Sequence, residues 1–265
     1  MSEYIKICED AARAGGEVLL EWQGRIHAKE KGPRDLVTEA DVASQVAIRE
    51  VLLGAFPSHE FVGEEDCTDE AKLISTAGSE KSGYRWIVDP LDGTTNYVHQ
   101  FPSFAVSIAL EHDGEIVVGA VYDPVLDHCY LAEAGKGASL NGNRLKVSSC
   151  KDLGQSLLAV SFSANVTRGS KEIDRFIEIL QCCRALRRLG SCALNLCYLA
   201  AGQLDGYFAT SVKSWDVAAG VLIVNESGGT VTNIDGGPFD LRNPKFAAAA
   251  TDSLQKQLVS VLKLV

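Results

Sequence analysis

The first half of the chain alternates between helical and strand-like patterns of hydrophobic residues. Apolar side chains recur at helical spacing across residues 4–22, and a second helical run follows Thr38, where Asp41 three positions later completes a capping box. Short apolar runs at 61–63 and 86–88 predict buried strands that end at acidic residues. Longer strand-like runs separated by turn residues predict an antiparallel meander, with strands at 104–111, 115–122 and 128–134.

The pattern changes after residue 150, where strand-like and helical runs alternate in the manner of an α/β unit. We expect strands at 156–162, 187–189, 206–210, 230–234 and 246–251, and helices at 169–182, 191–201, 216–227 and from 254 onward. No linker rich in proline or serine separates the two patterns, so we predict two halves, 1–150 and 151–265, that share an interface. The polar segment 67–83 is expected to be a surface excursion.

Composition excludes several classes of function. The 265 residues include 25 basic and 35 acidic side chains, and the net charge of −10 argues against a nucleic-acid partner. No run approaches the roughly 20 apolar residues of a membrane span, and the acidic, amphipathic amino end predicts no signal peptide. Eight cysteines without Cys-x-x-Cys spacing or clustered histidines argue against zinc and indicate reduced thiols in a cytoplasmic protein.

Acidic residues mark four separate corners of the predicted fold. Each of these acids ends an apolar run or opens a helix: Asp41, Glu64, Glu65, Asp89, Asp92 and Asp216. Carboxylates that converge in one cleft raise one another's pKa, and cations must neutralise such a cluster. Oxygen donors without histidine or cysteine favour magnesium, manganese or calcium. Taken singly, Asp41 and Asp216 also have the positions of helix caps, and Glu64-Glu65 that of a surface pair.

The segment 89–95, Asp-Pro-Leu-Asp-Gly-Thr-Thr, concentrates this chemistry. Pro90 turns the chain after the predicted strand, so two carboxylates three residues apart can face one site with the Leu91 carbonyl between them. Gly93 lets a ligand approach the backbone, and its N–H group and those of the two threonines can hold anionic oxygens. The Thr94 hydroxyl is placed to orient a water molecule. For this motif alone, a solvated turn is the alternative interpretation.

Three motifs occur in a fixed order along the chain. Gly-Glu-Glu lies at 63–65, Trp-Ile-Val-Asp-Pro-Leu-Asp-Gly-Thr-Thr-Asn-Tyr-Val at 86–98, and Trp-Asp-Val-Ala-Ala-Gly at 215–220. Together they resemble the magnesium-dependent, lithium-sensitive inositol monophosphatase family. Supporting matches extend the resemblance over nearly the whole chain, at 35–41, 190–193 and 237–240. The resemblance implies an α+β fold, a layered αβαβα sandwich in which an antiparallel-sheet half joins an α/β half.

The resemblance also implies ligands for two or three Mg²⁺ ions. Glu64, Asp89 and the Leu91 carbonyl would hold the first ion, and Asp89, Asp92 and Asp216 the second. A third, weaker ion would depend on Glu64, and lithium sensitivity is implied with it. The implied activity is the hydrolysis of a small phosphate monoester by in-line attack of water.

Catalytic and substrate-binding residues follow from the same resemblance. The Thr94 hydroxyl, paired with Asp41, would orient and deprotonate the attacking water. Residues implied to contact the substrate are Asp92, Gly93, Thr94, Thr95, Gly190, Ser191, Cys192 and Asp216. Cys192 has packing as its alternative role, and Lys31 either approaches the metal site from its loop or is a solvated lysine.

The choice of substrate is less constrained by the sequence. Asn96-Tyr97 resembles the inositol monophosphatase branch, which makes inositol 1-phosphate the leading substrate. Animal members of that branch place a substrate-contacting glutamate where this chain has Ala209, and often a histidine where it has Lys213. Fructose 1,6-bisphosphate, histidinol phosphate and NADP(H) are therefore alternative substrates.

The expected partner is thus a small-molecule phosphate, with no nucleic acid and no membrane involved. The resemblance further implies a homodimer. A non-catalytic regulatory protein on the same scaffold is the alternative from another class, and the intact ligand positions argue against it.

Overall fold

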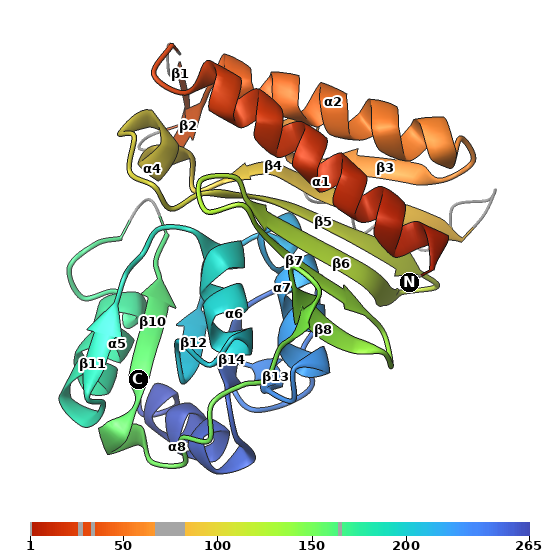
Figure 1. Ribbon diagram of the computed structural model, residues 1–265. Helices are drawn as coiled ribbons and strands as arrows, with labels where there is room; N and C mark the ends of the chain where they lie inside the picture. Colours follow the sequence, from red (N-terminus) through yellow and green to blue (C-terminus); the bar gives the residue numbers. More distant parts are fainter. Residues whose placement is uncertain (1, 26–28, 33–34, 67–82, 164–165) are drawn as a thin grey trace.

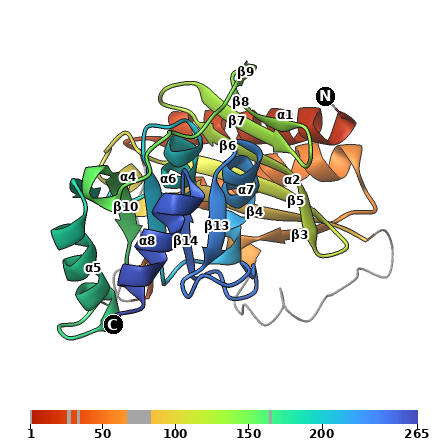
Figure 2. The same ribbon diagram turned by 90° about the horizontal axis from the view of Figure 1, so that it is seen from below.

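Five layers are stacked in the order helix, sheet, helix, sheet, helix (Figures 1 and 2). The computed structural model describes residues 2–25, 29–32, 35–66, 83–163 and 166–265. This arrangement confirms the expected α+β fold of the αβαβα type. The surface excursion expected at 67–83 lies outside the described residues, apart from Gly83.

Helices α1 (Glu3–Trp22) and α2 (Glu39–Ala55) form the outer layer over one face of the first sheet (Figure 1). Helix α2 begins as predicted because the Thr38 hydroxyl accepts the Ala40 N–H while the Asp41 carboxylate accepts the Thr38 N–H. The apolar faces of both helices are buried against the sheet, as the helical spacing requires. A hairpin, β1 (Lys29–Gly32) and β2 (Asp35–Val37), connects them.

The first sheet has seven strands in chain order. They are β3 (Glu60–Gly63), β4 (Tyr84–Asp92), β5 (Ala105–His112), β6 (Glu115–Asp123), β7 (His128–Glu133), β8 (Gly137–Leu140) and β9 (Asn143–Arg144). Strands β3 and β4 pair in parallel, and all later neighbours pair antiparallel, which confirms the predicted meander. The short pair β8–β9 was not predicted, because its residues are rich in glycine and asparagine.

Strand β4 differs from the prediction in a way that shapes the site. The expected strand ended at Asp89, whereas the observed strand continues through Pro90 to Asp92. Its register against β5 shifts between Asp89, which faces Ser107, and Asp92, which faces Ala105. One extra residue therefore bulges from β4, and a bulge is where a sheet tolerates a proline that has no N–H to donate.

The second sheet has the strand order β11-β10-β12-β14-β13. Its strands are β10 (Leu157–Ser161), β11 (Ala185–Arg187), β12 (Gly206–Ala209), β13 (Thr230–Asn233) and β14 (Phe246–Ala249). Strand β10 runs parallel to β11 and β12, while β14 runs antiparallel to β12 and β13. Strand β11 lies two residues earlier than the strand predicted at 187–189.

Four further helices complete the layers: α5 (Lys171–Cys182), α6 (Cys192–Ala200), α7 (Ser214–Glu226) and α8 (Asp252–Leu262). Helices α6 and α7 lie between the two sheets, and α5 and α8 cover the outer face of the second sheet (Figures 1 and 2). Helix α7 begins two residues before the predicted start, so Asp216 is its third residue rather than its first. A short helix, α4 (Thr94–Val98), follows β4 directly.

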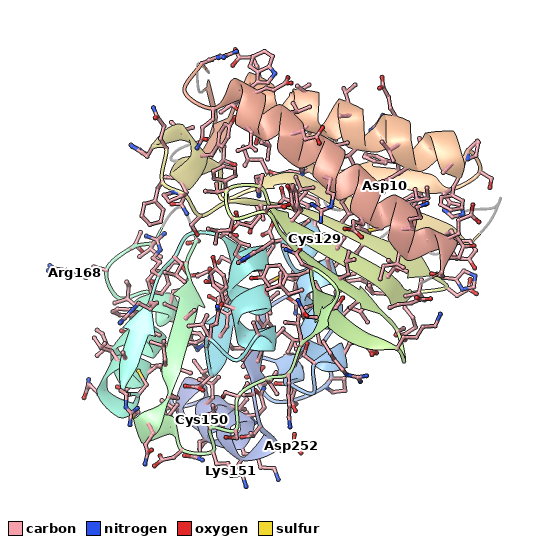
Figure 3. The ribbon with its side chains drawn as sticks, viewed as in Figure 1. Asp10, Cys129, Cys150, Lys151, Arg168 and Asp252 are labelled. Carbon is pink, nitrogen blue, oxygen red and sulfur yellow. The ribbon has the colours of Figure 1, made fainter. Side chains whose placement is uncertain are left out.

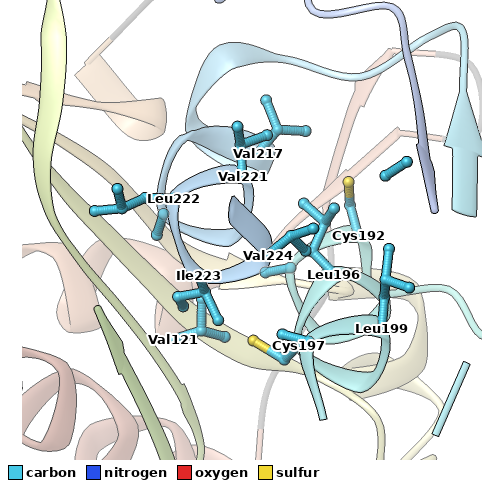
Figure 4. Packing of buried hydrophobic residues seen from close by; sticks show 14 of the residues in the cluster. Val121, Cys192, Leu196, Cys197, Leu199, Val217, Val221, Leu222, Ile223 and Val224 are labelled. Carbon is cyan, nitrogen blue, oxygen red and sulfur yellow. The ribbon is translucent and has the colours of Figure 1, made fainter. Parts of the chain in front are cut away.

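The middle layer joins the two halves of the chain. Side chains of α6 and α7, including Leu196, Cys197 and Ile223, pack with Val121 of the first sheet in one buried cluster (Figure 4). The same cluster includes Tyr207 of the second sheet. The predicted shared interface therefore has a physical basis, while the division at residue 150 stays a prediction.

Gly119 of β6 sets the distance between the first sheet and α7. A Cβ atom at this position would lie 3.0 Å from both Cα and the carbonyl oxygen of Ala219, which is closer than packed atoms approach. Because the obstructing atoms belong to the helix backbone, rotation of a side chain cannot relieve the overlap.

We expect Gly119→Ala to lower the free energy of unfolding by about 1–3 kcal/mol, because the added methyl group overpacks this contact. Gly54→Ala is the matched control, since no atom lies within 4 Å of a Cβ at Gly54 and its position in α2 favours alanine. Urea unfolding of the two variants measures the difference. Equal free energies of unfolding for the two variants would show that the sheet and α7 can move apart at no cost in stability.

Candidate active site

The bulge in β4 and the start of α7 bring two aspartates together. Ser107 lies opposite Asp89 in the sheet, and its hydroxyl donates to the carbonyl of Trp215 at 3.3 Å. Trp215 precedes Asp216, whose carboxyl group interacts electrostatically with Asp89. The Asp216 carboxylate also accepts the Lys213 N–H at 2.8 Å. Residues far apart in the sequence are thus fixed side by side by backbone contacts.

Asp92 joins this pair to the start of α6. Its Oδ2 accepts hydrogen bonds from the Ser191 hydroxyl and from the Ala193 N–H, the latter at 2.7 Å. Burial raises the pKa of Asp92 to about 6, and these hydrogen bonds oppose that shift. The predicted substrate-binding turn at Gly190, Ser191 and Cys192 therefore lies beside Asp92.

The acidic side chains also affect one another electrostatically. Burial raises the pKa of Asp89 well above its usual range, and repulsion from Glu64, Asp92 and Asp216 adds to the shift. Burial likewise raises the pKa of Asp216, followed by repulsion from Asp92 and Glu64. Carboxylates whose pKa is raised in this way need a proton or a cation to compensate their charge. Glu64 and Asp92 thus both act electrostatically on Asp89 and on Asp216, while the role of these four acids as ligands stays a prediction.

The donors fit a hard divalent cation by their chemistry, because all of them are carboxylate or carbonyl oxygens. Across the ranges that the structure describes, however, no three acidic, histidine or cysteine side chains already form a group that could hold an ion. The hydrogen bonds of these donor atoms show why they do not form such a group. Asp92 Oδ2 is turned toward Ser191, Asp89 Oδ1 accepts the Leu91 N–H at 3.0 Å, and the Leu91 carbonyl accepts the Thr94 hydroxyl at 3.2 Å. Small side-chain rotations would have to accompany metal binding.

Glu64 is positioned by the end of β3. It begins a 3₁₀ turn, Glu64–Asp66, directly after Gly63. Gln45 of α2 accepts the Glu65 N–H at 3.1 Å, and a side chain at Gly63 would overlap the Gln45 amide. Gln45 was not predicted as a site residue, because its contact with β3 depends on the packing of α2.

Thr94 and Asp41 were predicted to act as a pair, and each has another described partner. The Thr94 hydroxyl donates to Leu91, while Asp41 Oδ2 accepts the Thr38 hydroxyl at 2.6 Å and the Thr38 N–H at 2.9 Å. The bond from the Thr38 N–H gives Asp41 the capping role that its sequence position allowed. The Asp41 side chain is buried, with a relative exposure of 2%. Its catalytic pairing with Thr94 stays a prediction.

The remaining predicted residues line the same region. Gly93 has φ of +95° and precedes α4, a backbone conformation that favours glycine, and Thr95 is exposed in the first turn of α4. Burial raises the pKa of the Cys192 thiol well above its usual range, with Asp216 and Asp92 adding to the shift. Cys192 is therefore a neutral, packed side chain, as its alternative role stated. The side chain of Lys31 lies outside the described residues.

Asn96 is a positioning residue that the sequence marked only as a branch feature. Its side-chain amide donates to the carbonyl of Ser103 at 2.7 Å and to that of Leu189 at 2.8 Å. Gly190 follows with φ of +93°, and a Cβ there would lie 2.6 Å from the Asn96 amide nitrogen. Asn96 thus fixes the turn that carries Ser191 to Asp92.

The layered fold is that of the inositol monophosphatases, a family of sugar phosphatases that generally depend on metal ions. The sequence profile of the inositol monophosphatase family matches residues 1–264, and the chain belongs to this family. It is a phosphoric monoester hydrolase, so the enzymatic interpretation holds over that of a non-catalytic protein. No helix in the described ranges has the length and hydrophobicity of a membrane span.

Individual relatives agree with this assignment. Inositol monophosphatase 2 of Solanum lycopersicum is 40% identical over 252 residues, which cover 94% of each chain. Fructose-1,6-bisphosphatase/inositol-1-monophosphatase of Aquifex aeolicus is 39% identical and covers 90% of this chain and 88% of its own. The structure of the extragenic suppressor protein SuhB from Bartonella henselae superposes with a TM-score of 0.91 at 35% identity, covering 99% of both chains.

We expect Asp89→Asn to raise the free energy of unfolding of the metal-free protein by about 1–3 kcal/mol, because it removes a buried charge that its neighbours repel. The asparagine oxygen can still accept the Leu91 N–H, so the bulge stays intact. Thermal unfolding in EDTA measures the change.

Asp10→Asn on the outer helix α1 is the control, because this side chain is exposed (Figure 3). A metal-free Asp89→Asn protein less stable than this control would contradict the electrostatic interpretation. Added magnesium should stabilise the wild type more than Asp89→Asn, because the variant lacks a charged ligand.

Proposed function

We propose that the enzyme hydrolyses inositol 1-phosphate to inositol and phosphate with the help of two or three Mg²⁺ ions. The proposal is supported chiefly by the electrostatic interaction of the buried Asp89 with Glu64, Asp92 and Asp216. These residues, with the Leu91 carbonyl, would hold the metal. Bound magnesium would supply Lewis-acid stabilisation of the phosphoryl oxygens and lower the pKa of the attacking water.

The residues of the chain bind and orient the reactants in this proposal. The turn from Asp92 to Thr95 lies against the phosphate, and its backbone N–H groups donate to the phosphoryl oxygens. The Thr94 hydroxyl orients the water for in-line attack, and Asp41 accepts its proton. Burial of the carboxylates keeps bulk water away from the reacting phosphorus and strengthens each of these electrostatic contacts.

Specific features of the chain favour a direct attack by water. The pKa of Cys192 is raised by burial, so its thiol is a poor nucleophile. Each of the three aspartates has a carboxylate oxygen held by a backbone N–H group: Asp89 by Leu91, Asp92 by Ala193 and Asp216 by Lys213. The proposal therefore involves no covalent phosphoenzyme.

Fructose 1,6-bisphosphate is the second candidate substrate, because a relative that is 39% identical is named for both activities. The same site chemistry applies to either ester, and only the contacts to the alcohol would differ. A cytoplasmic homodimer that lithium inhibits completes the proposal, supported by the resemblance of the motifs to the family.

Phosphate release from a panel of esters tests the proposed function. The panel holds inositol 1-phosphate, fructose 1,6-bisphosphate, histidinol phosphate, NADP⁺ and p-nitrophenyl phosphate, each assayed with magnesium and with EDTA. We expect inositol 1-phosphate to have the highest kcat/KM, and EDTA to lower every rate by roughly 100-fold or more.

Asp89→Asn should lower the rate by roughly 1000-fold or more with every ester, while Asp10→Asn should leave it unchanged. Release of phosphate from no ester in magnesium would overturn the proposed function. A preference for fructose 1,6-bisphosphate would replace the substrate and keep the mechanism.

A further inference from the structure

Glu172, in the first turn of α5, accepts hydrogen bonds from three hydroxyl groups in two neighbouring loops. Its Oε1 accepts the hydroxyls of Thr210 and Ser211, both at 2.8 Å, and its Oε2 accepts the Ser163 hydroxyl at 2.8 Å. The Ser163 N–H also donates to Oε1 at 3.2 Å. We call Glu172, Ser163, Thr210 and Ser211 the hydroxyl cluster. None of these residues was identified from the sequence as part of the site.

The hydroxyl cluster lies at the sheet edge that leads to the active site. Strands β10 and β12 are parallel and pair Ser161 with Ala209 at their last residues, so the loops that follow them leave the same edge. In α/β sheets, ligands bind outside the carboxyl ends of such strands. In Figure 1, the arrow of β10 points toward α4, which follows the acidic bulge of β4.

Two short stretches of chain lead from the cluster toward the acidic site, one from Ser211 to Lys213 and one from Ser163 back to Ser161. The loop that contains Thr210 and Ser211 ends at Lys213, whose N–H holds Asp216. Closer to the sheet, the Tyr207 hydroxyl bonds Ser161 at 2.7 Å and also interacts with the Cys192 thiol beside Asp92 and Asp216. The cluster is therefore at the rim of the site that would hold the phosphate.

The hydrogen bonds of the cluster determine which kind of ligand this rim can bind. A hydroxyl group has one proton, and Ser163, Thr210 and Ser211 each direct that proton to Glu172. Burial acts to raise the pKa of Glu172, but the hydrogen bonds from Thr210, Ser163 and Ser211 outweigh it, so the carboxylate stays ionised at neutral pH. The oxygen lone pairs that remain can only accept hydrogen bonds. Such a surface suits alcohol hydroxyl groups and disfavours anions.

We propose that Glu172, with the hydroxyl cluster, recognises the hydroxyl groups of the alcohol part of the substrate. This inference rests on the proposed function and adds a specificity-determining residue to it. Glu172 is the specificity-determining residue, and Thr210 is the cluster member nearest the end of β12. The side chain of Ala209 itself offers no hydrogen-bond acceptor at the end of β12.

A purely structural role for Glu172 makes a different prediction. If Glu172 only braced the loop that holds Asp216, its loss would displace Asp216 and slow the hydrolysis of every phosphate ester alike. If it binds substrate hydroxyls, its loss acts mainly on esters that carry them. The ratio of kcat/KM between a polyol phosphate and p-nitrophenyl phosphate, which has no alcohol hydroxyls, separates the two roles.

The test compares Glu172→Gln with Glu178→Gln, a control in the same helix that changes the charge by the same amount. We use the polyol phosphate with the highest kcat/KM in the panel. Glu172→Gln should lower the kcat/KM ratio of the polyol phosphate to p-nitrophenyl phosphate by roughly 10- to 100-fold, since bonds to charged groups are the strong ones. Glu178→Gln should leave both rates unchanged. Thr210→Val, which removes a single neutral acceptor, should lower the ratio by roughly 3- to 10-fold.

The outcomes distinguish this inference from the proposed function. An unchanged ratio in Glu172→Gln and Thr210→Val, with both rates either intact or falling together, would overturn the role of Glu172 and leave the phosphatase function standing. Hydrolysis of p-nitrophenyl phosphate without hydrolysis of any polyol phosphate would also overturn it. If the wild type releases phosphate from no ester, the proposed function fails and the inference fails with it.

Discussion

Repulsion between buried carboxylates is the constraint around which the rest of this structure is arranged. Asp89 and Asp216 interact with each other, and each has its pKa raised by burial and by the charges of its neighbours. Such a pair is unfavourable unless a proton or a cation compensates it. The fold overcomes the repulsion with contacts that do not involve the carboxylates, among them the bond from Ser107 to Trp215 and the close packing of Gly119 on Ala219. The scaffold therefore keeps the acids together before any ligand is present.

The same scaffold explains how segments far apart in the sequence form one site. The bulge in β4 places Asp89 and Asp92 on a sheet in the first half of the chain, while α6 and α7 carry Ser191 and Asp216 from the second half. Both helices are packed between the sheets, where apolar side chains bury them on two faces. Asn96 adds a polar connection by holding the Leu189 carbonyl. Metal affinity and the stability of the middle layer are consequently linked.

The sequence predicted the elements with strong periodicity and the acids with clear local signals. The helix at 4–22, the meander and the capping box at Thr38 required only local patterns, and all of them are observed. The end of β4 was predicted wrongly because Asp-Pro has the composition of a turn, and only pairing with β5 shows that it is a bulge. Gln45 and Glu172 could not be found from the sequence, since their roles depend on which loops the folded chain brings to them. The sequence thus shows which residues carry the chemistry, but it does not show which residues hold those side chains in place.

Substrate recognition illustrates the same separation between local motif and tertiary contact. The family resemblance expects an acidic acceptor at the position of Ala209, and a comparison limited to aligned positions would conclude that the acceptor is lost. In the folded chain, however, Glu172 of helix α5 accepts hydrogen bonds from Thr210 and Ser211, the two residues that directly follow Ala209. The net charge of −10 is consistent with the two proposals, in which acids would hold cations at the centre of the site and an acid at the rim would accept neutral hydroxyls. Once cations are bound at the centre, their positive charge would attract the phosphate anion there and not to the acidic rim. The two groups of acids would therefore orient the substrate with its phosphate inward and its alcohol toward the rim.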